Sequence, residues 1–244
     1  MQWNEIKTSL YDLDYIASEE LAMSIHIAIN LERPLLLEGE AGIGKTALAL
    51  VLSKLYKTSL IRLQCYEGLD ASSTIYEWNY QKQLLSIRLN ENKNDNNVKI
   101  DDKIFSKEFL LERPLLKALT QKKSPVLLID EIDRADEEFE AYLLEILSEY
   151  QVSIPEYGTI KALSKPIVII TSNNTRDLSD ALRRRCIYNY VYYPKKELEL
   201  EILQKKLPNI DLELSRQIVN FVQNLRVQDI CLLYTSPSPR DEQS

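Results

Sequence analysis

The hydrophobic positions of the chain follow a helical period at first and then change to short apolar runs. Apolar residues recur at helical spacing from Ser18 to about Leu31, and Arg33 and Pro34 end that pattern. Five short runs, rich in apolar or β-branched residues and flanked by polar or turn-forming residues, follow along the chain. They are PLLLEG at 34–39, LIRLQC at 60–65, PVLLID at 125–130, IVIITSN at 167–173 and IYNYVYY at 187–193. Such runs are typical of strands that are buried on both faces of a parallel sheet.

Helical patterns separate several of these predicted strands. The segments KTALALVLSKLYK at 45–57 and ADEEFEAYLLEILSEY at 135–150 carry apolar residues at spacings of three and four. Asp133 is a candidate N-cap for the second of them. The run QVSIPEYGTIKAL at 151–163 alternates around a proline and a glycine, which predicts a β-hairpin inserted before the fourth strand. Strands that alternate with helices predict an α/β fold.

Composition and charge narrow the class of protein. The chain has 244 residues, 45% of them hydrophobic and 27% charged, which predicts a folded protein of one or two domains. Its net charge of −7 argues against a protein whose main task is to neutralise DNA phosphates. No apolar run approaches the roughly 20 residues that span a bilayer, and the first ten residues lack the regions of a signal peptide. We therefore expect a cytoplasmic protein without membrane insertion.

The cysteines and the single histidine argue against a structural metal. Cys65, Cys186 and Cys231 are odd in number and far apart, which predicts reduced thiols. The only histidine, His26, lies on the apolar-periodic helix, where we expect it to pack in the core. Histidine-based triads and most transition-metal sites are thereby nearly excluded.

The segment GEAGIGKT fits the eight-position phosphate loop G-x-x-x-x-G-K-[ST] and lies between a predicted strand and a predicted helix, as that motif requires. Successive backbone N–H groups of such a loop surround phosphates, and the helix N-terminus adds positive potential. Lys45 would neutralise the β- and γ-phosphates of ATP, and Thr46 would present its hydroxyl to Mg²⁺. The predicted nucleotide-binding residues are Gly39, Glu40, Ala41, Gly42, Ile43, Gly44, Lys45 and Thr46.

Two further strands end in polar residues that suit ATP hydrolysis. Asp130 ends the apolar run PVLLID and would act in the second shell of Mg²⁺, bound to it through water. Glu131 follows it and would orient the water that attacks the γ-phosphate. Asn173 or Asn174, at the end of IVIITSNN, would reach between the γ-phosphate and that water.

The stretch DALRRRCIYNY at 180–190 places three arginines directly before a predicted strand. Three functions fit it: solvated charge at a helix C-terminus, a nucleic-acid contact, or a catalytic arginine directed at another subunit. The string alone does not choose among them.

The order of the phosphate loop, LLIDEID, TSN and LRRRC resembles AAA+ ATPases, and more narrowly the MoxR family. The resemblance covers roughly Ser18 to Leu225, and the segments LQCYEGLDASSTIYEWNYQKQLL and LLIDEIDRADEEFEAYLLEILSEYQVSIPEYGTI resemble its CoxD-like branch. It implies a P-loop NTPase fold of AAA+ type, with a parallel sheet of order five, one, four, three, two flanked by helices. It also implies a helix-two insertion around Ala71–Leu85 and a hairpin before the sensor strand.

The resemblance also implies roles for particular residues. Asn173 matches the sensor asparagine of the family. In AAA+ proteins an arginine before the fifth strand reaches the γ-phosphate held by the next subunit, and RRRC resembles the Ser-Arg-Cys finger of the clamp loaders. Arg185 is therefore the first candidate for this finger, and Arg183 and Arg184 are its alternatives. No position of this chain matches the second sensor arginine, which lies in the lid of the family.

Three regions follow from the resemblance and from the pattern near the end of the chain. Residues 1–193 would form the nucleotide-binding α/β domain, and two amphipathic segments within residues 194–230 would form a helical lid that is cut short. Residues 231–244, CLLYTSPSPRDEQS, have neither a helical nor a strand period and resemble translated sequencing adapter. We therefore expect a non-native, disordered tail there.

The expected function is ATP binding and hydrolysis with ATP and Mg²⁺ as cofactors. The family resemblance implies a ring, usually a hexamer, that acts as a remodelling chaperone on a protein client. MoxR relatives commonly work with a von Willebrand factor A-domain protein, and the CoxD branch is associated with maturation of molybdenum-copper carbon monoxide dehydrogenase. Two alternatives are a nucleic-acid motor or restriction-type subunit, and a nucleotide-gated scaffold with little turnover. DNA-stimulated, salt-sensitive hydrolysis would indicate the motor, and binding without hydrolysis the scaffold.

Overall fold

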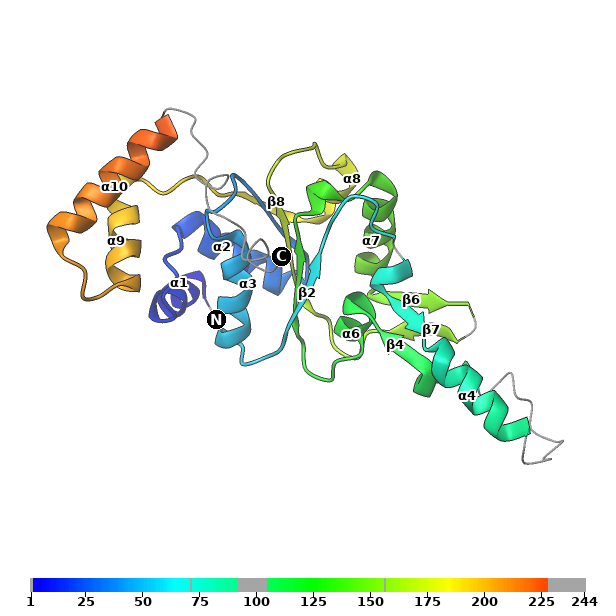
Figure 1. Cartoon of the computed structure of the whole chain (residues 1–244). Coiled ribbons are helices and arrows are strands. Elements are labelled where there is room, and N and C mark those ends of the chain that lie inside the picture. The colour runs from blue at the N-terminus through cyan, green and yellow to red at the C-terminus, as the bar shows by residue number, and fades with distance from the viewer. Residues whose placement is uncertain (1, 71, 92–104, 156, 228–244) are drawn as a thin grey trace.

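A five-stranded parallel sheet forms the centre of the computed structural model, which describes residues 2–70, 72–91, 105–155 and 157–227 (Figure 1). The strand order across the sheet is β2, β5, β8, β1, β9, and all four neighbouring pairs are parallel. The strands are β1 (Leu35–Glu38), β2 (Leu60–Gln64), β5 (Val126–Asp130), β8 (Ile167–Ser172) and β9 (Ile187–Tyr190). Counted in chain order within this sheet, they stand five, one, four, three, two from the β9 edge, which confirms the predicted order.

Helices cover both faces of the sheet because alternate strand residues point to opposite sides. One face packs against α1 (Trp3–Asp12), α2 (Glu19–Asn30) and α3 (Lys45–Leu55), around strand residues such as Leu35 and Leu37. The other face, which includes Leu36, packs against α6 (Pro114–Leu119), α7 (Glu137–Glu149) and α8 (Asp180–Arg185). The α/β fold with a parallel sheet between two helical layers is confirmed.

Two small antiparallel sheets lie beyond α6 and α7 (Figure 1). The hairpin predicted between the third and fourth strands is present as β6 (Gln151–Ile154) and β7 (Gly158–Lys161). In the second sheet, β3 (Tyr76–Trp78) pairs with β4 (Leu110–Glu112), and α4 (Tyr80–Glu91) follows β3. Short 3₁₀ turns η1 (Ser72–Thr74) and η2 (Lys107–Phe109) precede β3 and β4, and a third, η3 (Ile132–Arg134), lies between β5 and α7.

Two helices, α9 (Lys196–Lys206) and α10 (Leu212–Val227), follow the sheet and pack against each other. Arg226 of α10 forms a salt bridge with Glu199 of α9 at 2.7 Å. The ammonium group of Lys205 lies 3.2 Å from the ring centre of Tyr11, which connects this helix pair to α1. These helices are the segments predicted to form a lid. The predicted tail at 231–244 lies outside the described residues.

Two local predictions need correction. The fifth strand was expected over 187–193 but ends at Tyr190, because its only neighbour, β1, turns into the loop after Glu38. Tyr192 is exposed instead of buried. His26 does not belong to the core: it is half-buried beside Asn30 on the outer part of α2.

Cys65 and Cys186 are buried free thiols, as predicted, and burial raises the pKa of each to about 12. Cys231 lies outside the described residues. Among the helices that the structure describes, none combines the length and the apolar character needed to cross a membrane.

Candidate functional site

The predicted phosphate loop, residues 39–46, joins the end of β1 to the first turn of α3. Gly39 has φ of 146°, and a Cβ at this position would lie 2.2 Å from the carbonyl oxygen of Val191. No larger residue fits there. Gly44 is the N-cap of α3 with φ of 92°, a left-handed conformation that glycine adopts without strain. The turn thus directs the N-terminus of α3 toward the loop, which favours an anion at that place.

Lys45 is buried beneath this loop and folds back on it. Its ammonium group donates hydrogen bonds to the backbone carbonyls of Gly39 and Glu40, the latter at 2.7 Å. Burial lowers the pKa of Lys45 below its usual 10.5, and nearby carboxylates, Asp133 and Glu40 first, oppose that shift. A lysine in this place is ready to exchange carbonyl partners for phosphate oxygens.

Asp130 is the last residue of β5, and both of its carboxylate oxygens accept hydrogen bonds. Oδ1 accepts hydrogen bonds from the hydroxyl of Thr171 at 2.6 Å and from the hydroxyl of Thr46 at 3.0 Å. Oδ2 accepts two from the guanidinium of Arg62, from Nη2 at 2.5 Å and from Nε at 3.1 Å. Thr46 and Asp130, two residues predicted from separate motifs, are therefore in direct contact.

Glu131 adopts a left-handed backbone conformation, with φ of 57°. Its backbone N–H donates to the hydroxyl of Thr171 at 2.9 Å, and its carboxylate accepts from Nε of Arg134 at 2.8 Å. For a residue with a side chain this conformation is uncommon and occurs often at functional sites. Glu131 and Asp130, neighbours in the chain, therefore pair with different arginines, Arg134 and Arg62.

Asp133 does not cap the following helix, which corrects the prediction made from the sequence. Asp136 is the N-cap of α7 and accepts from the backbone N–H of Phe139. Asp133 instead accepts from the backbone N–H groups of Asn173 and Thr175, both at 3.1 Å, and from the hydroxyl of Thr175. It thus ties the turn after β5 to the turn after β8.

Those contacts place Asn173 beside the end of β5, where it is half-buried, whereas Asn174 is exposed with φ of 59°. Burial raises the pKa of Asp133, but the hydrogen bonds from Thr175 and Asn173 outweigh burial and leave that pKa below its usual 3.8. Of the two asparagines, Asn173 is therefore the one whose backbone N–H is bound by Asp133 in the turn after β5.

The three arginines at the end of α8 have different surroundings. Arg183 donates from Nη2 to the carboxylate of Glu38 at 3.0 Å. Arg184 is 83% exposed, and its nearest acid, Asp180, is 3.9 Å away. Arg185 uses Nη1 to donate to the carbonyl of Leu144 at 3.1 Å and to the hydroxyl of Ser148 at 2.6 Å, both on α7.

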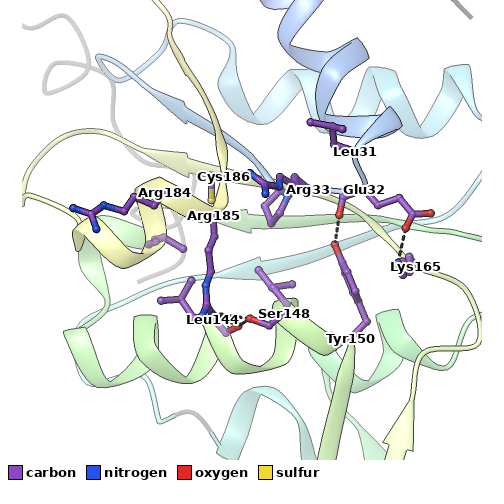
Figure 2. Close-up of a pocket in the computed structure, with 13 residues that line it drawn as sticks. Leu31, Glu32, Arg33, Leu144, Ser148, Tyr150, Lys165, Arg184, Arg185 and Cys186 are labelled. Carbon is purple, nitrogen blue, oxygen red and sulfur yellow. Dashed lines mark hydrogen bonds and ion pairs between the residues drawn. The ribbon is translucent and has the colours of Figure 1, made fainter.

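Arg184 and Arg185 line a cavity of about 300 Å³ between α7, α8 and the residues that precede β1 (Figure 2). Figure 2 shows Arg185 extended toward α7 and Arg184 directed away from it. Arg33 and Lys165 add two more cations to the lining, and among the described residues Glu32 is its only acid. The cavity is thus predominantly cationic, and it lies apart from the phosphate loop.

Four residues of this arrangement were missed by sequence analysis: Glu38, Arg62, Arg134 and Thr171. Glu38, Arg62 and Thr171 lie within apolar strand runs, Arg134 lies in the turn after β5, and Arg62 interrupts LIRLQC at its third position. A charged residue within a predicted buried strand is the signal that could have identified Arg62.

Comparison with known proteins assigns the same fold and class. Residues 34–186 match the family model described as AAA domain (dynein-related subfamily). An uncharacterized protein of Staphylococcus haemolyticus is 27% identical over 219 residues, which cover 87% of this chain and 76% of that protein. An uncharacterized protein of Staphylococcus epidermidis is 27% identical over 203 residues, which cover 81% of this chain and 70% of that protein.

A solved structure shares the fold. The crystal structure of a "putative ATPase" from Cytophaga hutchinsonii superposes with a TM-score of 0.55 and 22% sequence identity. The match covers 89% of this chain and 62% of the solved chain, so this chain spans less than two thirds of that protein's length.

Proposed function

Because the chain belongs to the AAA domain family (dynein-related subfamily) and is an ATPase, we propose that residues 39–46, Asp130, Glu131 and Asn173 form its site of ATP hydrolysis. One observation carries this proposal. Thr46 of the phosphate loop and Asp130 of β5 are 84 residues apart in the chain but 3.0 Å apart in space. Glu131 and Asn173 lie at the same carboxyl edge of the sheet, where open α/β sheets bind ligands.

In this proposal the loop binds the phosphates of ATP. Backbone N–H groups at residues 39–46 and the N-terminus of α3 face the phosphate oxygens, and Lys45 leaves the carbonyls of Gly39 and Glu40 to bind them. The hydroxyl of Thr46 and the carboxylate of Asp130 are hard oxygen donors in contact with each other, which fits Mg²⁺. Bound with ATP, Mg²⁺ neutralises charge on the β- and γ-phosphates.

Glu131 would then orient the attacking water and accept its proton, while Asn173 contacts the same water. The carboxylate of Glu131 must first turn away from Arg134, which holds it at 2.8 Å in this structure. Asp133 supports this step because it fixes the backbone of Asn173 through a hydrogen bond of 3.1 Å.

We further propose that subunits assemble into a ring, with an arginine of one subunit acting on ATP bound to the next. Arg185 remains the first candidate on the family resemblance. Its two contacts to α7 both use Nη1, so the guanidinium has further donors for a phosphate. The exposure of Arg184 favours it as the alternative. Arg183 is the least suited, because it is paired with the buried carboxylate of Glu38.

The proposed biological role is a MoxR-type chaperone of the CoxD-like branch, which remodels or matures a protein or metalloenzyme complex. A von Willebrand factor A-domain protein is the expected partner type. This role rests on the sequence resemblance described above, including helices α9 and α10 as part of a lid. The net charge of −7 supports a protein client over a nucleic-acid track.

The test uses a version of the protein with a complete lid and measures the molar mass of its Glu131→Gln variant by light scattering, with and without ATP and Mg²⁺. A variant that holds ATP without hydrolysing it should shift from monomer to ring in the presence of ATP. The Lys45→Ala chain is the matched control and should stay monomeric. A Glu131→Gln chain that binds ATP but keeps the monomer mass at all concentrations would contradict the ring.

A further inference from the structure

Asp130 forms an ion pair with the guanidinium of Arg62. Its side chain is 3% exposed, and Arg62 lies across Oδ2 with two N–H donors, at 2.5 and 3.1 Å. Both donors share this one oxygen, and hydrogen bonds between a guanidinium and a carboxylate are strong because both groups are charged. The single negative charge of Asp130 is therefore balanced before any metal arrives.

Two other acidic residues after β5, Glu131 and Asp133, also have polar partners within the protein. Glu131 is paired with Arg134, and Asp133 accepts three hydrogen bonds from the turn after β8. Within the described residues, no group of three or more histidine, cysteine, aspartate or glutamate side chains is placed to hold a metal ion. The protein by itself thus presents one neutralised carboxylate and one hydroxyl, that of Thr46, to a divalent cation.

The guanidinium of Arg62 has access to solvent. Arg62 lies on β2, the edge strand of the sheet, and its side chain is 53% exposed. Its Nη2 also donates to the side-chain oxygen of Gln64 at 2.6 Å, so the guanidinium has a second partner on the same strand. If Arg62 leaves Asp130, water solvates the guanidinium, so no buried charge is left unpaired on its side of the contact.

We propose that Arg62 is a positioning residue that neutralises and orients Asp130 until nucleotide binds, and thereby makes Mg²⁺ binding depend on the nucleotide. The inference rests on the proposed function of the site. A carboxylate paired with Arg62 attracts Mg²⁺ weakly. The phosphates of a nucleotide bring enough negative charge to bind Mg²⁺ with Thr46 and Asp130 and to release Arg62.

The experiment titrates Mg²⁺ alone, without nucleotide, into the wild-type and Arg62→Gln chains and measures binding by calorimetry and by thermal unfolding. Wild type should show no response up to about 10 mM Mg²⁺, because the guanidinium of Arg62 already neutralises the carboxylate of Asp130. Arg62→Gln should bind Mg²⁺ at least about tenfold more tightly and gain thermal stability as Mg²⁺ is added. Equal responses of the two chains would overturn the proposal.

Three variants show whether the effect belongs to this contact. Arg62→Lys keeps the charge and should stay insensitive to Mg²⁺. Arg216→Gln removes an exposed arginine from α10 and should behave as wild type. The double variant Arg62→Gln/Asp130→Asn lacks the carboxylate and should lose the response of Arg62→Gln. A response that persists in the double variant would overturn the assignment to Asp130.

Wild type provides a test that needs no variant. With ADP present, Mg²⁺ should bind, and without ADP it should not. Submillimolar binding of Mg²⁺ to the nucleotide-free wild-type chain would overturn the role of Arg62. If wild type binds nucleotide with Mg²⁺ but Arg62→Gln gains no response to Mg²⁺ alone, the Arg62 proposal fails and the ATP site stands. If wild type binds no nucleotide at all, the ATP site itself fails.

Discussion

The carboxylate of Glu38 accepts a hydrogen bond from Nη2 of Arg183 at 3.0 Å, across 145 residues of chain. Glu38 is the last residue of β1, directly before the phosphate loop, and Arg183 belongs to α8, which carries the arginine triplet. The pair therefore links the loop that would bind a subunit's own ATP to the helix whose arginine would contact the ATP of the next subunit.

A double-mutant cycle on this pair should show clear coupling. Glu38→Gln, Arg183→Ala and the double variant should give an interaction energy of roughly 1–2 kcal/mol in the free energy of unfolding, measured by urea denaturation. Glu38 is 3% exposed and Arg183 is its ion-pair partner, so removing Arg183 leaves a buried carboxylate without that partner, whereas the 38% exposure of Arg183 moderates the effect. Arg184→Ala is the control and should change stability by less than about 0.5 kcal/mol. Additive effects of Glu38→Gln and Arg183→Ala would show that the contact carries no coupling.

Asp133→Ala should destabilise the chain by about 1–3 kcal/mol at neutral pH, since three donors from Asn173 and Thr175 lose their acceptor. The variant should also slow ATP turnover, because the turn that holds Asn173 is released. Urea denaturation at neutral pH and a steady-state turnover assay measure the two effects. Thr159→Ala, at an exposed hydroxyl of the hairpin, is the control.

The stability difference between wild type and Asp133→Ala should depend on pH. The pKa of Asp133 is lower in the folded chain than its usual 3.8, so its ionised form stabilises the fold. This contribution is complete above the unfolded pKa and is lost as pH falls through the folded pKa. Unfolding measured from pH 7 down to about 2 should therefore show the difference shrinking below about pH 4. A difference that stays constant over that range would contradict the assigned role.

Sequence patterns predicted the parts of this structure that depend on local periodicity. The five parallel strands follow from apolar runs, and the loop at 39–46 follows from glycines and Lys45 between a strand and a helix. The end of β9 was not predictable from its own residues, because the end of its neighbour β1 sets it. The role of Asp133 was missed for a similar reason. Its partners, Asn173 and Thr175, are about 40 residues away in the chain.

Long-range partners also explain what was missed in the candidate site. Arg62 and Asp130 contact each other because β2 and β5 are neighbours, and this adjacency follows from sheet order and not from local sequence. The arginine triplet could not be resolved from the sequence, because its three members are identical neighbours. In the structure Arg183, Arg184 and Arg185 have three different environments, since they point to different sides of one short helix.

Mixing experiments should identify the arginine that acts between subunits, in a version of the protein with a complete lid. Arg185→Ala should bind ATP normally, because the loop belongs to its own subunit, but lose turnover by ~10³–10⁵. Glu131→Gln has an inactive site but an intact arginine. Rings formed from both variants should therefore recover activity that neither shows alone, when the subunits are mixed before assembly.

Arg184→Ala and Arg183→Ala, assayed in the same way, are the matched comparisons. Loss of turnover in Arg184→Ala with normal turnover in Arg185→Ala would assign the role to the exposed arginine. Normal turnover in all three variants would show that none of the three arginines acts between subunits and that they only add charge to the surface.

The most direct test of the ATP site compares Lys45→Ala and Glu131→Gln with wild type in ATP titrations and single-turnover assays. Lys45→Ala should lose ATP binding, because the phosphate charge in the loop has no counter-charge. Glu131→Gln should bind ATP about as well as wild type and hydrolyse it at least about 100-fold more slowly, since its amide orients water but accepts no proton. Normal hydrolysis by Glu131→Gln would contradict the account.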